Sequence, residues 1–256
     1  MINNEELLDN FSKKRKNYSG GVEDIETSDE NQSKLRTLIG LLMHLSVHTR
    51  PDISFSVTLL STKLTTANKL DIQAALHIVR YLAGTRDLGL IFSSEATEKL
   101  FTYVDASYLT HSDAKSHSGM TYRLGTNTGS FFSRSQKQNL VTRSSAESEL
   151  HALHKVVCDI QWLRLMLKFL GSNQDGPTVI YEDNKSTMLL ASGSAKMREV
   201  SRHLNMRYCY VRESMSAEIR LEYVNTKDQI ADILTKNISC TKEFLRLRKL
   251  LLNDDV

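Results

Sequence analysis

Hydrophobic positions change their spacing twice along the chain. Residues 1–31 mix basic and acidic stretches and hold too few large apolar side chains to offset the entropy of ordering, so we expect a disordered or loosely attached leader. From Ser33 to Thr85 the apolar residues recur at helical spacing, with a break at "TRPD" and a stop at Gly84. This pattern predicts a helical segment over residues 32–95, a packing module with no chemistry of its own.

Beyond residue 95 the spacing becomes that of strands and then of strands alternating with helices. Short apolar runs between polar and glycine turns predict strands at 100–105, 119–124, 129–133, 178–183 and 219–224. Helical spacing predicts helices at about 145–170, 184–191 and 198–215, another beginning at 227, and a last one at 242–252. Three antiparallel strands followed by alternating helices and strands indicate an α/β fold, a mixed five-stranded sheet flanked by helices.

Three acids stand where strands or helices of such a sheet meet. Asp105 ends the first predicted strand, Asp183 ends the fourth, and Asp232 lies early in "QIADIL". Acids in these places can converge on one crevice at the end of the sheet. Each also has a purely structural alternative: Asp183 could cap a helix, and Asp232 could complement a helix dipole.

A fourth acid must come from the long helix, which offers Glu147 and Glu149. Glu149 lies three residues after Ala146 and four before Leu153, beside the apolar stripe that faces the sheet. Glu147 has the capping-box spacing from Ser144 and lies on the polar face. The periodicity therefore predicts that Glu149 points at the sheet and that Glu147 serves the helix start.

Four carboxylates without a Cys or His ligand suit a hard cation such as Mg²⁺. Two such ions about 3.5–4 Å apart can clamp an in-line displacement at phosphorus, the chemistry of phosphodiester hydrolysis. Without a metal the clustered negative charges would repel one another, so a purely structural cluster would be costly.

Composition changes this picture little. The net charge of the 256 residues is only +3, so any nucleic-acid surface must be local. Cys158, Cys209 and Cys240 lie far apart and lack zinc-type spacing, which favours a reduced, intracellular location. No apolar run reaches the roughly 18 residues that span a bilayer, so we expect no membrane partner.

The chain resembles the ribonuclease H domain of copia-type LTR retrotransposon Pol polyproteins. Motifs follow in the family's order over about residues 100 to 240: "YVDASY", "SHSGMTYRLG", "SQKQNLVTRSSAESELHAL", "VIYEDNKSTMLLA" and "LEYVNTKDQIADILTK". Upstream, "LIGLLMHLSVHTRPDISFSVTLLS" and "HIVRYLAGTRDLGLIF" resemble the segment that connects the reverse transcriptase to the nuclease. The resemblance implies a connection-like segment at 32–95, a ribonuclease H-like domain at 96–240 and a helical tail at 241–256.

By this resemblance, four residues are the catalytic, metal-binding acids: Asp105, Glu149, Asp183 and Asp232. They would bind two Mg²⁺ ions, with Mn²⁺ as a substitute, and cut the RNA strand of an RNA–DNA hybrid. "YVDA" is then the first nuclease strand and not a polymerase hairpin, because Ala106 stands where the second aspartate would be. The polymerase palm has no counterpart, so the expected partners are the hybrid and a polymerase domain of the full polyprotein. The expected location is the cytoplasm, in a virus-like particle, and also the nucleus.

The alternative is a retroelement-derived protein that binds nucleic acid or a partner without cutting. Loss of any of the four acids would have favoured it, and all four are present.

Substrate contacts are expected from basic residues near the long helix and after the second helix. Candidates for phosphate binding are Arg134, Lys137, Arg143, Lys196, Arg198, Arg202 and Arg207. Ordinary solvated basic faces are the alternative. His151 and His154 lack a third ligand and are not expected to bind a metal. Trp162, at helical spacing with Phe169, is expected in the core rather than as a stacking platform.

Overall fold

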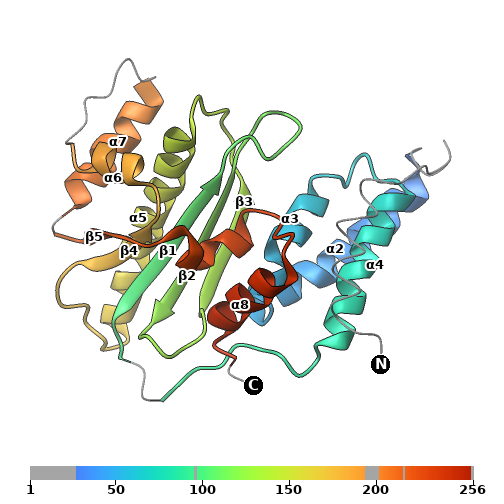
Figure 1. Cartoon of the computed structure of the whole chain (residues 1–256), viewed down its shortest axis with the longest axis horizontal. Coiled ribbons are helices and arrows are strands. Elements are labelled where there is room, and N and C mark those ends of the chain that lie inside the picture. Colours follow the sequence, from blue (N-terminus) through green and yellow to red (C-terminus); the bar gives the residue numbers. More distant parts are fainter. Residues whose placement is uncertain (1–26, 95–96, 194–201, 216, 255–256) are drawn as a thin grey trace.

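The computed structural model describes residues 27–94, 97–193, 202–215 and 217–254 (Figure 1). Most of the predicted leader lies outside these residues. Among the described residues, no helix combines the length and the apolar character needed to cross a bilayer.

The N-terminal part is a group of helices with its own core. It comprises α2 (Asp29–His48), the 3₁₀ turn η2 (Pro51–Ile53), α3 (Ser54–Ser61) and α4 (Lys69–Gly84). The helix α2 begins at Asp29 rather than at residue 32, because the Ser28 hydroxyl accepts the backbone N–H of Asn31 and caps the helix. Apolar residues at helical spacing, among them Leu35 and Ile39, are buried between the helices.

The remainder contains the mixed five-stranded sheet that the sequence predicts. Its strands are β1 (Leu100–Ser107), β2 (His117–Leu124), β3 (Phe132–Lys137), β4 (Thr178–Glu182) and β5 (Ile219–Tyr223). Their order is β3-β2-β1-β4-β5; β1, β2 and β3 are antiparallel, while β4 runs parallel to β1 and β5 parallel to β4.

The third strand begins later than predicted. The stretch before it bonds elsewhere: the N–H of Gly129 donates to Ile91 O at 2.7 Å and that of Ser130 to Leu251 O at 3.1 Å. A β-carbon on Gly129 would lie 2.8 Å from Leu252 O, so only glycine allows this close approach. Regular pairing with β2 therefore starts at Phe132.

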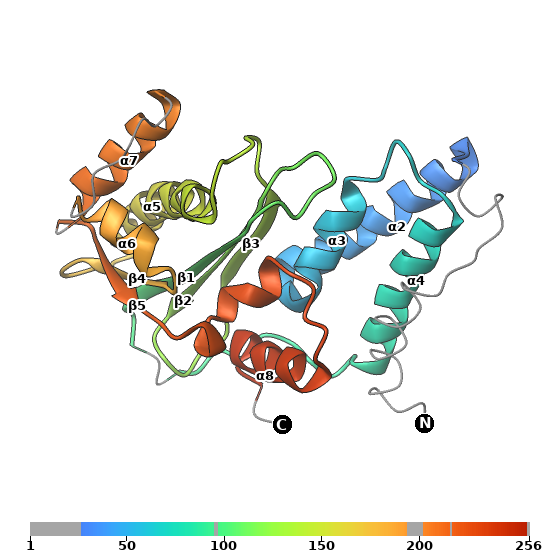
Figure 2. The ribbon, with the colours of Figure 1, turned by 45° about the horizontal axis from the view of Figure 1, so that its top comes forward.

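Helices cover both faces of the sheet (Figure 2). On one face lies α5 (Ser145–Phe169), which buries Leu153, Val157 and Ile160 against β1 and β2. On the other face lie the 3₁₀ turn η4 (Ile230–Leu234) and α8 (Thr241–Leu252). The apolar spacing predicted a helix starting at 227; the structure has the short turn η3 (Thr226–Asp228) followed by η4 instead.

Two smaller helices pack beside α5. They are α6 (Lys185–Ala191) and α7 (Arg202–Ser214). The prediction that Trp162 is a core residue is wrong, because its side chain is 56% exposed, and Phe169 is 91% exposed. Both lie off the stripe of α5 that faces the sheet, and the last turns of the helix have no layer over them.

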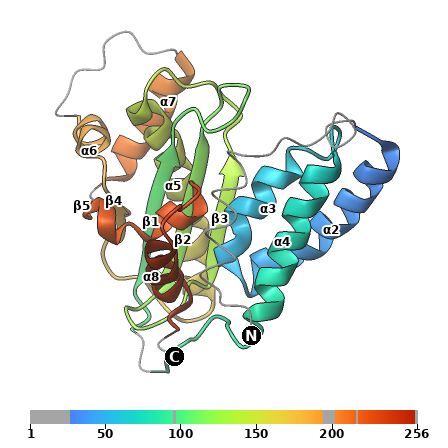
Figure 3. The same ribbon diagram turned by 45° about the vertical axis from the view of Figure 1, so that its right-hand side comes forward.

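The helical group packs against the β3 edge of the sheet and against α8 (Figure 3). The Thr58 hydroxyl in α3 donates to Ser135 O in β3 at 3.0 Å. In α8, Arg248 Nη1 lies 3.2 Å from the Tyr81 hydroxyl of α4 and donates to it. The helical group therefore shields the edge strand, which would otherwise offer unpaired backbone groups.

Candidate metal centre

Two carboxylates meet at the carboxyl ends of neighbouring parallel strands. Asp105 lies near the end of β1, where it pairs with Gly119 of β2, and Asp183 directly follows β4. Because β1 and β4 run parallel, their carboxyl ends lie at the same edge of the sheet. The strand pattern predicted this placement.

The third carboxylate comes from the first turns of α5. Glu149 is buried, with 5% of its surface exposed, whereas the neighbouring Glu147 is only half-buried. One carboxylate oxygen each from Asp105, Glu149 and Asp183 lie within 4.8 Å of one another. The structure thus brings together three of the four predicted acids.

Glu147 serves the start of the helix. Its Oε2 accepts the backbone N–H of Arg143 at 2.8 Å, and its own N–H donates to the Ser144 hydroxyl at 3.2 Å. In a capping box the Glu147 side chain would accept the backbone N–H of Ser144. It accepts the N–H of the preceding residue, Arg143, instead.

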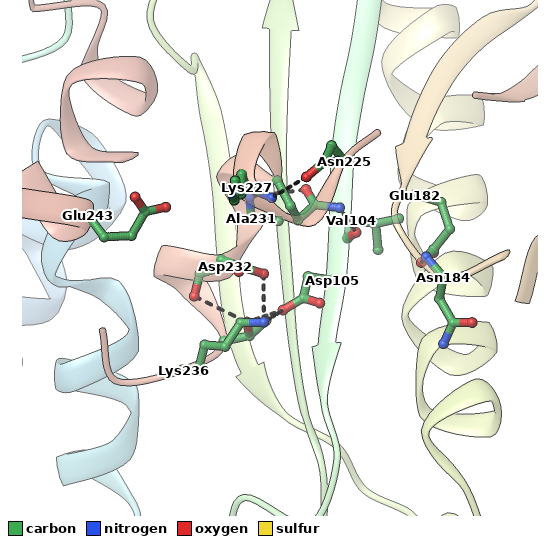
Figure 4. A network of polar contacts seen from close by, with 12 residues as sticks. Val104, Asp105, Glu182, Asn184, Asn225, Lys227, Ala231, Asp232, Lys236 and Glu243 are labelled. Carbon is green, nitrogen blue, oxygen red and sulfur yellow. Dashed lines mark hydrogen bonds and ion pairs between the residues drawn. The ribbon is translucent and has the colours of Figure 1, made fainter. Parts of the chain in front are cut away.

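The fourth acid, Asp232, lies beside Asp105 on the turn η4, outside the group of three (Figure 4). Its position is held by neighbours of the turn: Gln229 Nε2 donates to Val104 O at 2.9 Å, and the Ser135 hydroxyl donates to Leu234 O at 2.7 Å. These bonds tie η4 to β1 and β3.

Gly119 is what lets η4 approach the sheet. A β-carbon there would lie 2.6 Å from Thr235 Cγ2 and 2.8 Å from Leu234 Cβ. With glycine at this position, the Thr235 hydroxyl reaches Asp105 and donates a hydrogen bond to Oδ2. The sheet and the turn therefore share one polar junction.

Lys236 bridges the two aspartates. Its Nζ lies 2.8 Å from Asp232 Oδ1 and 3.8 Å from Asp105 Oδ2. Figure 4 shows the lysine beside the two aspartates, with dashed lines for these interactions. Burial lowers the pKa of Lys236, but the carboxylates of Asp105 and Asp232 outweigh it, so the pKa is raised and the side chain stays charged.

A fifth acid was not predicted from the sequence. Glu182 is fully buried; its Oε1 accepts the N–H of Asn184 at 3.0 Å, and its Oε2 has no hydrogen-bond partner. The signal was present in β4, where Thr178, Ile180 and Glu182 alternate onto one buried face.

Burial and mutual repulsion favour the protonated forms of these acids. Burial raises the pKa of Glu149 well above its usual value, and the nearby Glu182 and Asp105 raise it further. Burial, opposed in part by Lys236, raises the pKa of Asp105, and burial together with Asp105 raises that of Asp232 to about 7. The pKa of Glu182 also rises well above normal because of its burial. Such a cluster stores repulsion that a bound cation would relieve.

The donor set fits a hard divalent cation. All three grouped ligands offer carboxylate oxygens, and Glu149 Oε2 is buried without a hydrogen-bond partner. Mg²⁺ and Mn²⁺ prefer such oxygens. The three acids also line an open cleft, together with Asn184, Lys185, Ser186, Tyr223 and Lys236.

The predicted phosphate-binding residues do not line this cleft among the parts of the chain that are described. Arg134 pairs with Asp159 at 3.2 Å, Lys137 pairs with Asp113 at 2.8 Å, and Arg207 Nη1 donates to His151 Nδ1 at 2.6 Å. The side chain of Arg143 is exposed near the start of α5. Lys196, Arg198 and the side chain of Arg202 lie outside the described residues.

The basic residues at the cleft are Lys185 and Lys236 instead. Neither was predicted from the sequence, because their positions depend on how α6 and η4 pack relative to the strands. In the case of Lys236, its place four residues after Asp232 was the available signal.

No protein-family model matches the chain. It is 33% identical over 226 residues to the "Retrovirus-related Pol polyprotein from transposon RE1" of Arabidopsis thaliana; the match covers 88% of this chain and 15% of that protein. It is also 36% identical over 126 residues to "Secreted RxLR effector protein 161" of Plasmopara viticola, covering 49% of this chain and 87% of that protein. The chain thus spans about 15% of the length of the polyprotein it matches.

Among solved structures, the chain is similar to LC11-RNase H1 in complex with an RNA/DNA hybrid. The TM-score is 0.41 at 13% identity, and the match covers 54% of this chain and 94% of that one.

Proposed function

The chain belongs to the retrovirus-related Pol polyproteins of transposons, and from this premise we propose that it hydrolyses the RNA strand of RNA–DNA hybrids in a metal-dependent reaction. The observation that carries the proposal is the convergence of Asp105, Glu149 and Asp183, whose oxygens lie within 4.8 Å of one another at the floor of an open cleft.

Two Mg²⁺ ions are part of the proposal. Asp105, Glu149 and Asp183 would hold one ion, and Asp105 with Asp232 the other. When bound, the ions supply the charge that activates water and stabilises the leaving oxygen. Mn²⁺ offers the same chemistry with the same oxygen ligands.

The residues of the chain position the ligands. The Thr235 hydroxyl fixes the orientation of the Asp105 carboxylate, and the Gln229–Val104 bond holds η4 against β1. The cleft is open, so the backbone of a duplex can reach the acids, and Lys185 at its wall can meet a phosphate. Recognition of the hybrid would depend on groove shape and 2′-hydroxyls rather than on base edges.

The test is cleavage of an end-labelled RNA–DNA hybrid in Mg²⁺ by the purified chain. Asp105→Asn and Asp183→Asn should abolish cleavage with native folding, because each removes a charged ligand at nearly constant volume. Asp113→Asn, an exposed acid outside the group of three, is the matched control and should cut normally. Wild-type rates in both ligand variants would overturn the proposal.

The polymerase partner and the location belong to the same proposal. We expect the chain to extend no primer by itself and to work with a polymerase domain of a full polyprotein. Its place would be a cytoplasmic virus-like particle, and also the nucleus.

A second candidate is a protein that binds nucleic acid or a partner without cutting. The match to a secreted effector over 49% of this chain favours it. Tight hybrid binding without cleavage in either Mg²⁺ or Mn²⁺ would support this candidate.

A further inference from the structure

One cation of the chain already lies among the acids of the centre. The ammonium of Lys236 is 2.8 Å from Asp232 and 3.8 Å from Asp105, and its side chain is 39% exposed. Among the described residues it forms no ion pair with Glu149 or Asp183, which belong to the group of three. The centre is therefore asymmetric: one half has an internal cation and the other does not.

The backbone fixes the start of this side chain. The N–H of Lys236 donates to Asp232 O at 3.1 Å, which closes the turn η4 and places the lysine four residues after the aspartate it pairs with. The same turn presents Thr235 to Asp105. Rotation of the side chain can therefore shift the ammonium while the turn keeps both bonds.

The side chain has somewhere to go. Lys236 lines the open cleft and also a cavity of about 90 Å³ between the turn and the helical group, bounded by Asp52, Phe55 and Ile233 among others. A flexible four-carbon stem can turn from one space to the other, toward solvent at the rim or toward Asp52.

We propose that Lys236 is a built-in counter-cation that competes with one of the two metal ions for Asp105 and Asp232. This inference rests on the proposed function, because it assumes that the acids bind divalent ions. The first ion binds at Asp105, Glu149 and Asp183, of which only Asp105 forms an ion pair with Lys236. The second ion binds more weakly, since it must displace the lysine from its two carboxylates.

The consequence is a centre that keeps one ion and recruits the other reversibly. In the metal-free protein the lysine offsets repulsion between Asp105 and Asp232, so the junction of β1 and η4 stays closed. Lys236 thus acts as a positioning residue that sets the concentration of metal at which the centre fills.

The experiment measures Mn²⁺ binding without substrate, by isothermal titration of the full chain and by Mn²⁺-dependent melting temperature. Lys236→Met removes the charge and keeps the length of the side chain. Lys185→Met is the matched control, because Lys185 lines the same cleft but lies over the Tyr223 ring, 4.7 Å from its centroid. Lys236→Arg keeps the charge.

Wild type should bind one ion tightly and a second one weakly. Lys236→Met should lower the dissociation constant of the second ion at least tenfold. It should also lower the melting temperature of the metal-free protein and enlarge the increase in melting temperature that Mn²⁺ produces. Lys185→Met and Lys236→Arg should leave the second dissociation constant within about twofold of wild type. If Lys236→Met is too unstable without metal, the titration is done from the melting curves at increasing Mn²⁺, which report the same affinity.

Two other results distinguish a failure of this inference from a failure of the proposed metal centre. If wild type binds two ions and Lys236→Met leaves the second constant unchanged or weakens both sites, Lys236 does not compete and the inference is overturned alone. If neither wild type nor Lys236→Met binds Mn²⁺, the proposed metal centre is overturned and this inference with it.

Discussion

Replacing Glu149 by glutamine should lower the rate of cleavage and raise the stability of the metal-free protein. Glu149 is 5% exposed, and one of its oxygens lies within 4.8 Å of oxygens of both Asp105 and Asp183. Two full charges at that separation repel by about 3.5 kcal/mol at an effective dielectric constant near 20. Because burial and neighbouring acids raise the pKa of Glu149, part of that repulsion is already relieved by protonation.

The net gain on neutralising Glu149 is therefore a fraction of the pairwise figure, about 1–2 kcal/mol in the free energy of unfolding of the metal-free protein. For a chain of this size that corresponds to roughly 2–8 °C in melting temperature. Cleavage should fall by orders of magnitude, since the variant lacks a charged ligand.

Glu147→Gln is the internal control, two residues away on the same helix. A glutamine oxygen can still accept the N–H of Arg143, so stability should fall by about 0.3–1 kcal/mol at most, and cleavage should stay near wild type.

The assay pairs single-turnover cleavage of a hybrid at saturating Mg²⁺ with thermal melts in a chelator and in Mg²⁺. A metal-free Glu149→Gln protein that melts below wild type would refute the repulsion argument. If Glu147→Gln were inactive and Glu149→Gln active, the assignment of the face of α5 that lies against the sheet would be wrong.

Three further predictions address the junction, the pH dependence and the helical group. Gly119→Ala should lower the free energy of unfolding by about 1–3 kcal/mol and slow cleavage. The reason is that the added β-carbon would lie 2.6 Å from Thr235 Cγ2 and push η4 away. An unchanged melting temperature and unchanged activity would contradict this prediction. The pKa of Asp232 is raised to about 7 in the folded protein, above its unfolded value of 3.8. The metal-free protein should therefore lose stability as the pH rises from about 4 through 7, which melting scans in a chelator should show. The stabilisation by Mg²⁺ should grow over the same pH range. Asp52→Asn should lower the free energy of unfolding, measured in urea, by about 3–5 kcal/mol. The substitution leaves the buried Arg50 guanidinium without its anion, which lies 2.8 Å away. The control Asp87→Asn, at an exposed site, should change the free energy of unfolding by almost nothing.

Elements whose residues satisfy a local rule were predictable. The alternation of strands and the periodicity of α5 depend only on which neighbours along the chain are apolar, so β1, β4 and the inward direction of Glu149 followed from spacing alone. The strand directions predicted that Asp105 and Asp183 would lie at one edge of the sheet.

Elements whose bonds go to distant residues were not predictable in the same way. The start of β3 depends on Ile91 and Leu251, which take the backbone groups of Gly129 and Ser130. Lys137 and Arg207 look like free cations in the sequence, yet Asp113 and His151 are their partners in the fold. Trp162 is a large aromatic residue of the kind that cores contain, but it lies off the stripe of α5 that faces the sheet and is 56% exposed.

The sequence by itself determined the class of the fold, the strand ends that carry the acids and the face of the helix that supplies Glu149, because each follows from short-range periodicity. Only the tertiary structure decided that Glu182 joins the acids, that Gly119 makes room for η4, and that Lys236 reaches both Asp105 and Asp232. The physical reason is that charge repulsion and steric approach act between atoms that are close in space, and β1 and η4 are separated by more than a hundred residues of intervening chain.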